Sequence, residues 1–147
     1  MPDERALWIC PNCGRTFANR NQSHTCQPLG KLPTHFAGKD EVVRETFDRV
    51  VEVVRLLGPF EILPEKSRIA FHTRMSFAAF VPRRHWLDGH VVLAERFESA
   101  RFLRIETYSR HNILHAFRLY TPTEVDEEVK AWLTQAYAVG RQHHLNG

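Results

Sequence analysis

Apolar residues recur at helical spacing in the stretch from Asp40 to Leu57. One stripe of a helix would collect Val43, Phe47, Val50, Val51, Val54 and Leu57. Asp40 and Glu41 suit the positive end of such a helix, and Gly58-Pro59 would stop it. The pattern therefore predicts an amphipathic helix over residues 40–57.

The period changes to strict alternation after residue 65. Between Lys66 and Phe77 one face would carry Ile69, Phe71, Met75 and Phe77, and the other Lys66, Arg68, His72 and Arg74. This run continues through residues 78–81 to Pro82, and Asp88-Gly89 is typical of a turn before a strand at 90–97. Further alternating runs cover 102–108 and 112–120. We expect four or five antiparallel strands with one buried face.

The last helix is indicated at both of its ends. Thr121 is a suitable N-cap, Pro122 suits the first helical position, and Glu124 completes a capping box. Gly140 follows the last apolar residue as the expected C-terminal stop. The chain is thus expected to be α+β: an antiparallel sheet of four to five strands flanked by an N-terminal and a C-terminal helix, over residues 40–147.

The first thirty residues contain all the cysteines of the chain. Cys10 and Cys13 lie on a turn set by Pro11 and Gly14, and ten residues later comes a His-x-Cys pair, His24 and Cys26. The spacing favours one tetrahedral, structural Zn²⁺ site formed by Cys10, Cys13, His24 and Cys26, with His35 as the alternative fourth ligand. A redox Cys-x-x-Cys pair is the competing interpretation, but it would be expected at the N-terminus of a helix. Residues 1–30 would form this zinc-finger-like segment, and residues 31–39 a linker in which Phe36 inserts into the following domain.

Composition limits the class of protein. An apolar fraction of 43% in 147 residues is enough for one domain with a small appendage. No apolar run is long enough to cross a bilayer, and the first residues, Met1-Pro2-Asp3-Glu4-Arg5, have neither the basic nor the apolar region expected of a signal peptide. We therefore expect a cytoplasmic protein with no membrane partner. The formal charge of +3 is weak evidence for nucleic acid, so the distribution of charge matters more.

The polar face of the predicted sheet is rich in cations. The candidates for anion binding are Lys66, Arg68, Arg74, Arg104 and Arg118, with His72 and Arg96 beside them and only Glu106 as an opposing charge. Guanidinium groups of this kind bind phosphate or carboxylate, so a non-enzymatic module with an anionic partner, nucleic acid first, is the leading hypothesis. The competing interpretation is an ordinary solvated sheet face.

His115 shares the alternation of Ile113 and Phe117 and would therefore lie on the apolar face. It is either a hydrogen-bonded core histidine or the centre of a small-ligand or weak hydrolase pocket. Outside the finger the chain has no thiol nucleophile, Gly-x-Ser-x-Gly elbow or phosphate-binding loop, so enzymatic activity is not indicated. A structural adaptor that docks through the finger is the third hypothesis.

Several motifs carry a family resemblance. They are Trp8-x-Cys10-Pro11-x-Cys13-Gly14-Arg15-x-Phe17, Asn21-Gln22-x-His24-x-Cys26, His35-Phe36-x-Gly38-Lys39, Arg68-Ile69-x-Phe71, Trp86-Leu87-Asp88, Trp132-Leu133 and Ala136-Tyr137-Ala138-Val139-Gly140. Together they resemble the bacterial domain-of-unknown-function family numbered 5655, in the subset with an N-terminal zinc-finger-like segment. The resemblance implies bacterial origin and zinc at the four positions above, and it implies no activity.

Overall fold

The computed structural model describes residues 8–9, 11, 16–17 and 29–142. Two short strands, β1 (Trp8–Ile9) and β2 (Thr16–Phe17), pair in antiparallel fashion. A 3₁₀ helix, η1 (Leu32–Phe36), follows within the stretch predicted as a linker. The Phe36 ring packs 5.2 Å from that of Phe47, as predicted, so this segment is anchored to the core.

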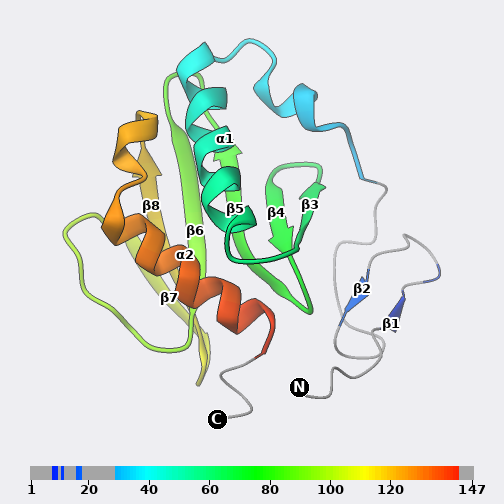
Figure 1. The fold of residues 1–147 in the computed structure, drawn as a ribbon, viewed down its shortest axis with the longest axis vertical. Helices are drawn as coiled ribbons and strands as arrows, with labels where there is room; N and C mark the ends of the chain where they lie inside the picture. The colour runs from blue at the N-terminus through cyan, green and yellow to red at the C-terminus, as the bar shows by residue number, and fades with distance from the viewer. Residues whose placement is uncertain (1–7, 10, 12–15, 18–28, 143–147) are drawn as a thin grey trace.

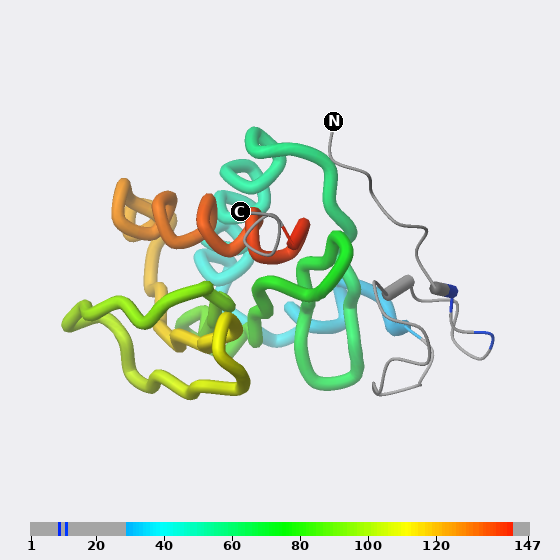
Figure 2. Tube along the Cα trace, turned by 90° about the horizontal axis from the view of Figure 1, so that it is seen from below, coloured from blue at the N-terminus to red at the C-terminus, as the bar shows by residue number. Residues whose placement is uncertain are grey.

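Six strands form one antiparallel sheet in the order β3-β4-β5-β6-β8-β7. They are β3 (Glu61–Pro64), β4 (Ile69–His72), β5 (Ser76–Pro82), β6 (Leu87–Leu93), β7 (Arg104–Ser109) and β8 (Asn112–Leu119). The helices α1 (Glu41–Arg55) and α2 (Glu127–Gly140) both cover the same face of this sheet (Figures 1 and 2). The α+β class is confirmed, but the sheet has six strands rather than four or five.

Three local features explain the difference in strands. The run predicted to continue from Lys66 to Pro82 turns at residues 73–75 and forms two antiparallel strands, β4 and β5. β3 is only four residues long and ends in a proline, which is too short for alternation to be visible in the sequence. Asp88-Gly89 is not a turn but lies inside β6, and the turn falls at residues 83–86, where the Arg83 amide donates to the Trp86 carbonyl at 2.8 Å. Gly89 is required because a Cβ there would lie 2.7 Å from the Phe80 ring.

The core lies between the sheet and the two helices. The stripe predicted for the first helix is confirmed, because Val43, Phe47, Val50 and Val54 are at most 1% exposed. They pack on Phe71, Phe77 and Phe80 from the sheet, and Val129 and Leu133 from α2 complete this cluster. The burial of large aromatic side chains is the main source of its stability.

The C-terminal helix begins later than the sequence suggests. The capping box of Thr121 and Glu124 is present, but it starts a separate 3₁₀ helix, η2 (Pro122–Glu124). α2 has its own N-cap, Asp126, whose carboxylate accepts from the Val129 amide at 3.1 Å. Gly140 is the last residue of α2 rather than the residue after it, and a Cβ there would lie 2.5 Å from the Phe77 ring.

The sheet has two edges of different character. At β3, the carbonyl of Pro64 accepts a hydrogen bond from the Gly30 amide at 2.8 Å. At the opposite edge, β7 is mostly exposed, and its register with β8 shifts between Thr107 and Ser109.

The face of the sheet opposite α1 and α2, here called the open face, is not uniformly wet. Some of its apolar residues are buried without belonging to the cluster beneath the helices: Leu63, Ala70, Ala79, Val92 and Leu114 are 0–8% exposed. The site described next lies on this face.

Candidate anion-binding site

His90 lies near the middle of the open face, in β6. The strand registers place it in one row across the sheet, Leu63, Ala70, Ala79, His90, Ala116 and Arg104. Alanines therefore flank His90 on both neighbouring strands. Because an alanine side chain ends at Cβ, Ala79 and Ala116 take up little space beside the imidazole.

A cavity of about 210 Å³ opens at this point, here called the His90 cavity. Its lining comes from five strands or their ends: Arg68, Met75, Ser76, Ala78, His90, Val92, Tyr108, Asn112 and Leu114. The floor is apolar and the rim carries hydroxyl, amide, imidazole and guanidinium groups. Pockets for drug-sized ligands are larger, about 300–1,000 Å³, so this one suits a small molecule or a single chemical group.

The His90 imidazole is held in its neutral form. Burial, and after it the positive charges of Arg68 and Arg104, together lower the pKa of His90 from 6.5 to about 4. Within the described part of the chain the ring makes no hydrogen bond. An anion bound beside this half-buried imidazole would be stabilised by the positive charges of the two guanidinium groups.

Three arginines on the open face are paired with carboxylates. The Nε atoms donate from Arg68 to Glu65 at 2.7 Å and from Arg104 to Glu106 at 2.6 Å. Arg118 donates to Asp88 at 2.9 Å, and Asp88 also accepts from Arg83 at 2.9 Å. The hydrogen bond to Asp88, followed by the contact with Tyr120, raises the pKa of Arg118. The sequence alternation predicts only Glu106 on this face. Glu65 lies outside the predicted strands, and Asp88 is predicted in a turn, whereas it lies in β6.

Among the predicted cations, all of which lie in the described part of the chain, only Arg68 lines the His90 cavity. Lys66 is exposed in the turn between β3 and β4. Arg74 is 8% exposed in the turn after β4, where its Nε donates to Gln142 at 3.2 Å, and Arg96 lies in the loop after β6, 3.7 Å from Glu98. The alternation that placed His72 and Arg74 on a wet face is wrong at its end, because β4 stops at residue 72 and His72 is 1% exposed.

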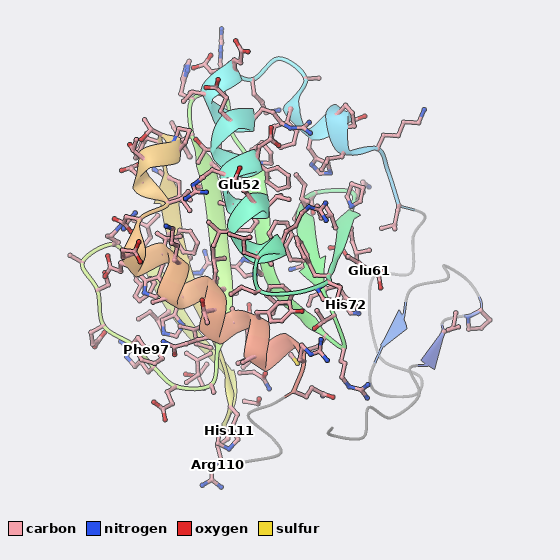
Figure 3. The ribbon with its side chains drawn as sticks, viewed as in Figure 1. Glu52, Glu61, His72, Phe97, Arg110 and His111 are labelled. Carbon is pink, nitrogen blue, oxygen red and sulfur yellow. The ribbon has the colours of Figure 1, made fainter. Side chains whose placement is uncertain are left out.

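Two further polar side chains define the cavity wall. The Ser76 hydroxyl lies 3.0 Å from Nδ1 of the buried His72, which Figure 3 shows beside Glu61, its partner across β3 and β4. Asn112 donates from Nδ2 to the Ser109 hydroxyl at 2.7 Å, but its Oδ1 is buried and has no partner among the described residues. Ser76 is thus already engaged, whereas Asn112 has an acceptor to offer.

His115 has the environment of a core histidine. Its Nε2 accepts from the Phe97 amide at 3.0 Å, so Nδ1 carries the proton and donates to the Ile113 carbonyl at 2.9 Å. The side chain is fully buried, the Phe102 ring lies 4.8 Å away, and burial lowers the pKa of His115. Both ring nitrogens are used, and neither is left for a ligand.

A second cavity of about 270 Å³ lies beside the end of α2. It is lined by Pro59, Phe60, Glu61, His72, Thr73, Arg74 and Arg141. Its cationic groups include Arg74, whose Nε donates to Gln142 at 3.2 Å.

The predicted zinc ligands Cys10, Cys13, His24 and Cys26 lie outside the described residues. The alternative ligand His35 lies in η1, where its Nε2 is 2.8 Å from the Glu65 carbonyl. Within residues 29–142 and the few described before them, no group of three or more metal-ligating side chains occurs. The zinc site therefore stays a prediction from spacing.

Sequence reasoning missed His90 and Asn112. His90 was assigned to the start of a strand after a turn, and nothing in its local sequence, Gly89-His90-Val91, indicates a site. The alanines at positions 70, 79 and 116 would have pointed to His90. They fall into one row with it only once the strand registers are known.

A family model matches most of the described chain. No helix in the part of the chain described here is long and apolar enough to span a membrane. No curated protein and no solved structure matches the sequence. A family model described as a domain of unknown function (DUF5655) matches residues 33–140, from η1 to the last residue of α2. The chain belongs to the DUF5655 family.

Proposed function

We propose that the chain is a non-enzymatic binding module that receives a small anionic ligand, a phosphate or carboxylate group, in the His90 cavity. The observation that carries this proposal is the position of His90, half-buried, without a hydrogen bond in the described residues and close to two guanidinium groups. An anion there would be bound by His90 and Arg68, which line the cavity, and attracted by Arg104, whose charge acts on His90 from outside the lining.

The arginines retain the donors that such a ligand needs. In Arg68 and in Arg104 only Nε is engaged within the described part of the chain, with Glu65 and Glu106. The terminal nitrogens of each guanidinium group therefore stay available for a second acceptor, and the planar group suits a bidentate anion. Half-exposed ion pairs of this kind are worth at most about 1 kcal/mol, so a ligand can share or replace the carboxylate.

Nucleic acid, the partner expected from the sequence, has weaker support. The arginines of the open face are matched by Glu65, Asp88 and Glu106, which would repel a continuous phosphate backbone. A cavity of about 210 Å³ favours one anionic group over an extended polymer. The two partners also differ in salt dependence, because log affinity for a polyanion falls steeply and linearly with log salt.

Inorganic phosphate should bind the full-length protein, and Arg68→Ala and Arg104→Ala should each raise its dissociation constant about tenfold. The expected size follows from losing one charge-assisted hydrogen bond, which is worth roughly 1.5–3 kcal/mol. Isothermal titration calorimetry at low salt and pH 6 would measure the affinity, and amide NMR shifts would locate the site.

Arg49→Ala is the matched control, because Arg49 lies on α1, on the opposite side of the sheet, and pairs with Glu52. It should bind phosphate like the unmodified protein. Absence of phosphate binding at millimolar concentration would refute the proposal, as would equal affinity in all three variants. Steeply salt-dependent binding of generic DNA or RNA without phosphate binding would assign the open face to nucleic acid instead.

We also propose that Cys10, Cys13, His24 and Cys26 bind one structural Zn²⁺. The support is their spacing, which matches closed tetrahedral sites with thiolate and imidazole ligands. Four protein ligands would leave no open position for a substrate.

The purified protein should contain about one zinc per chain by elemental analysis, and Cys13→Ser should lose it. The variant should keep the thermal unfolding transition of the α+β domain, because the core of residues 40–140 contains none of these ligands. Ser23→Ala, between the proposed ligands, is the control and should retain the metal. Collapse of the whole unfolding transition in Cys13→Ser would mean that the finger belongs to the main core.

A further inference from the structure

The two ends of the His90 cavity differ in what they can offer a ligand. Arg68 and His90 form one end, where an anion would be held if the function proposed above is correct. Asn112 and Tyr108 belong to the strands on the other side, β8 and β7. Between them the surface is apolar, formed by Val92 and Leu114.

The Asn112 side chain has one amide atom to spare. Nδ2 is used by the Ser109 hydroxyl at 2.7 Å, which leaves Oδ1 as a buried acceptor without a partner in the described part of the chain. An unsatisfied buried acceptor costs roughly 1–3 kcal/mol, and a donor that reaches it recovers that cost. Ser76, on the same wall, is occupied by His72.

We propose that the ligand of the His90 cavity is a short-chain anion that also carries a hydroxyl or ammonium group, which donates to Asn112 Oδ1. This inference rests on the proposed function and adds the second polar group. Polyol phosphates, hydroxy acids and amino acids have this chemistry: an anionic head for Arg68 and His90, a few carbons for the apolar floor, and a donor at the far end. A simple anion such as phosphate fills only the first part.

Three ligands with the same three-carbon skeleton test the inference: n-propyl phosphate, glycerol 1-phosphate and 3-aminopropyl phosphate. The unmodified protein should bind one or both of the donor-bearing ligands about tenfold more tightly than n-propyl phosphate, by calorimetry. In Asn112→Leu this preference should disappear, because the acceptor is lost while the bulk is kept. Asn112→Asp should retain it, since a carboxylate oxygen also accepts.

The outcomes separate this inference from the function on which it depends. If all three phosphates bind equally and Arg68→Ala weakens each of them, the anion site stands and the role of Asn112 is wrong. If none of them binds, the proposed function itself fails. A circular dichroism spectrum would show whether Asn112→Leu folds. If it does not, the comparison of Asn112→Asp with the unmodified protein tests the role of Asn112. The carboxylate of Asn112→Asp should increase the preference for the ammonium ligand over the hydroxyl ligand, and an unchanged preference would contradict the inference.

Discussion

Phe71→Ala should lower the free energy of unfolding by about 3–5 kcal/mol. Phe71 is fully buried, and its ring centroid lies 4.9–6.3 Å from those of Phe47, Phe60, Phe77 and Phe80. These neighbours come from α1, the segment before β3, and β5, so a cavity at residue 71 loosens contacts between all three. Urea unfolding followed by circular dichroism would give the free energy, and the melting temperature should fall by on the order of 10 °C.

Tyr108→Ala is the control for this prediction. Tyr108 is also an aromatic residue of the sheet, but it is 64% exposed, so its removal should change stability by less than about 0.5 kcal/mol. A loss below about 1 kcal/mol for Phe71→Ala would contradict the idea that the aromatic cluster is the centre of the core.

The second large effect is expected on acidification. The folded protein holds the pKa of His90 near 4, whereas the unfolded chain would have 6.5, so between these values the unfolded state binds more protons. His90 therefore contributes to stability fully above pH 6.5, and the contribution is lost as the pH falls towards 4. The loss should reach up to about 3 kcal/mol, from a shift of this size at about 1.4 kcal/mol per unit.

His90→Gln isolates this contribution, because glutamine does not titrate while other groups, including the buried His115, act equally in both proteins. The stability of the unmodified protein should fall more steeply than that of His90→Gln between pH 6.5 and 4, in buffers without phosphate. Arg68 on the β4 side and Arg104 on the β7 side, with their carboxylates Glu65 and Glu106, are the charges that face His90. Parallel stability curves for the two proteins would contradict the environment described here.

The sequence predicted well those elements that are long enough for their hydrophobic period to repeat. Fifteen residues of α1 repeat the same apolar stripe several times, and the position of Asp40 at its start follows from the same pattern. β3, with four residues, repeats nothing, and the turn signal at Asp88-Gly89 was misleading because Gly89 is needed for the space under Phe80. Local sequence does not distinguish a glycine that turns the chain from one that makes room for a ring.

The candidate site was predictable only in part. The sequence indicated that Arg68, Arg104 and Arg118 share a face, since this needs only the alternation of each strand. It did not show that Glu65 and Asp88 pair with two of them, or that alanines from β5 and β8 flank His90. Those neighbours meet across strands whose register is set by the packing of the other face, so no local pattern contains them.

The two edges of the sheet also bear on how this protein behaves at high concentration. An uncovered strand edge is a template on which a second molecule can extend the sheet, and proteins avoid this with short strands, prolines, charges and irregular register. β3 combines its short length with Pro64, whose carbonyl is already bonded to Gly30, and β7 combines Arg104 and Glu106 with its shifted pairing near Ser109. Edge-to-edge polymerisation is therefore discouraged on both sides of the sheet.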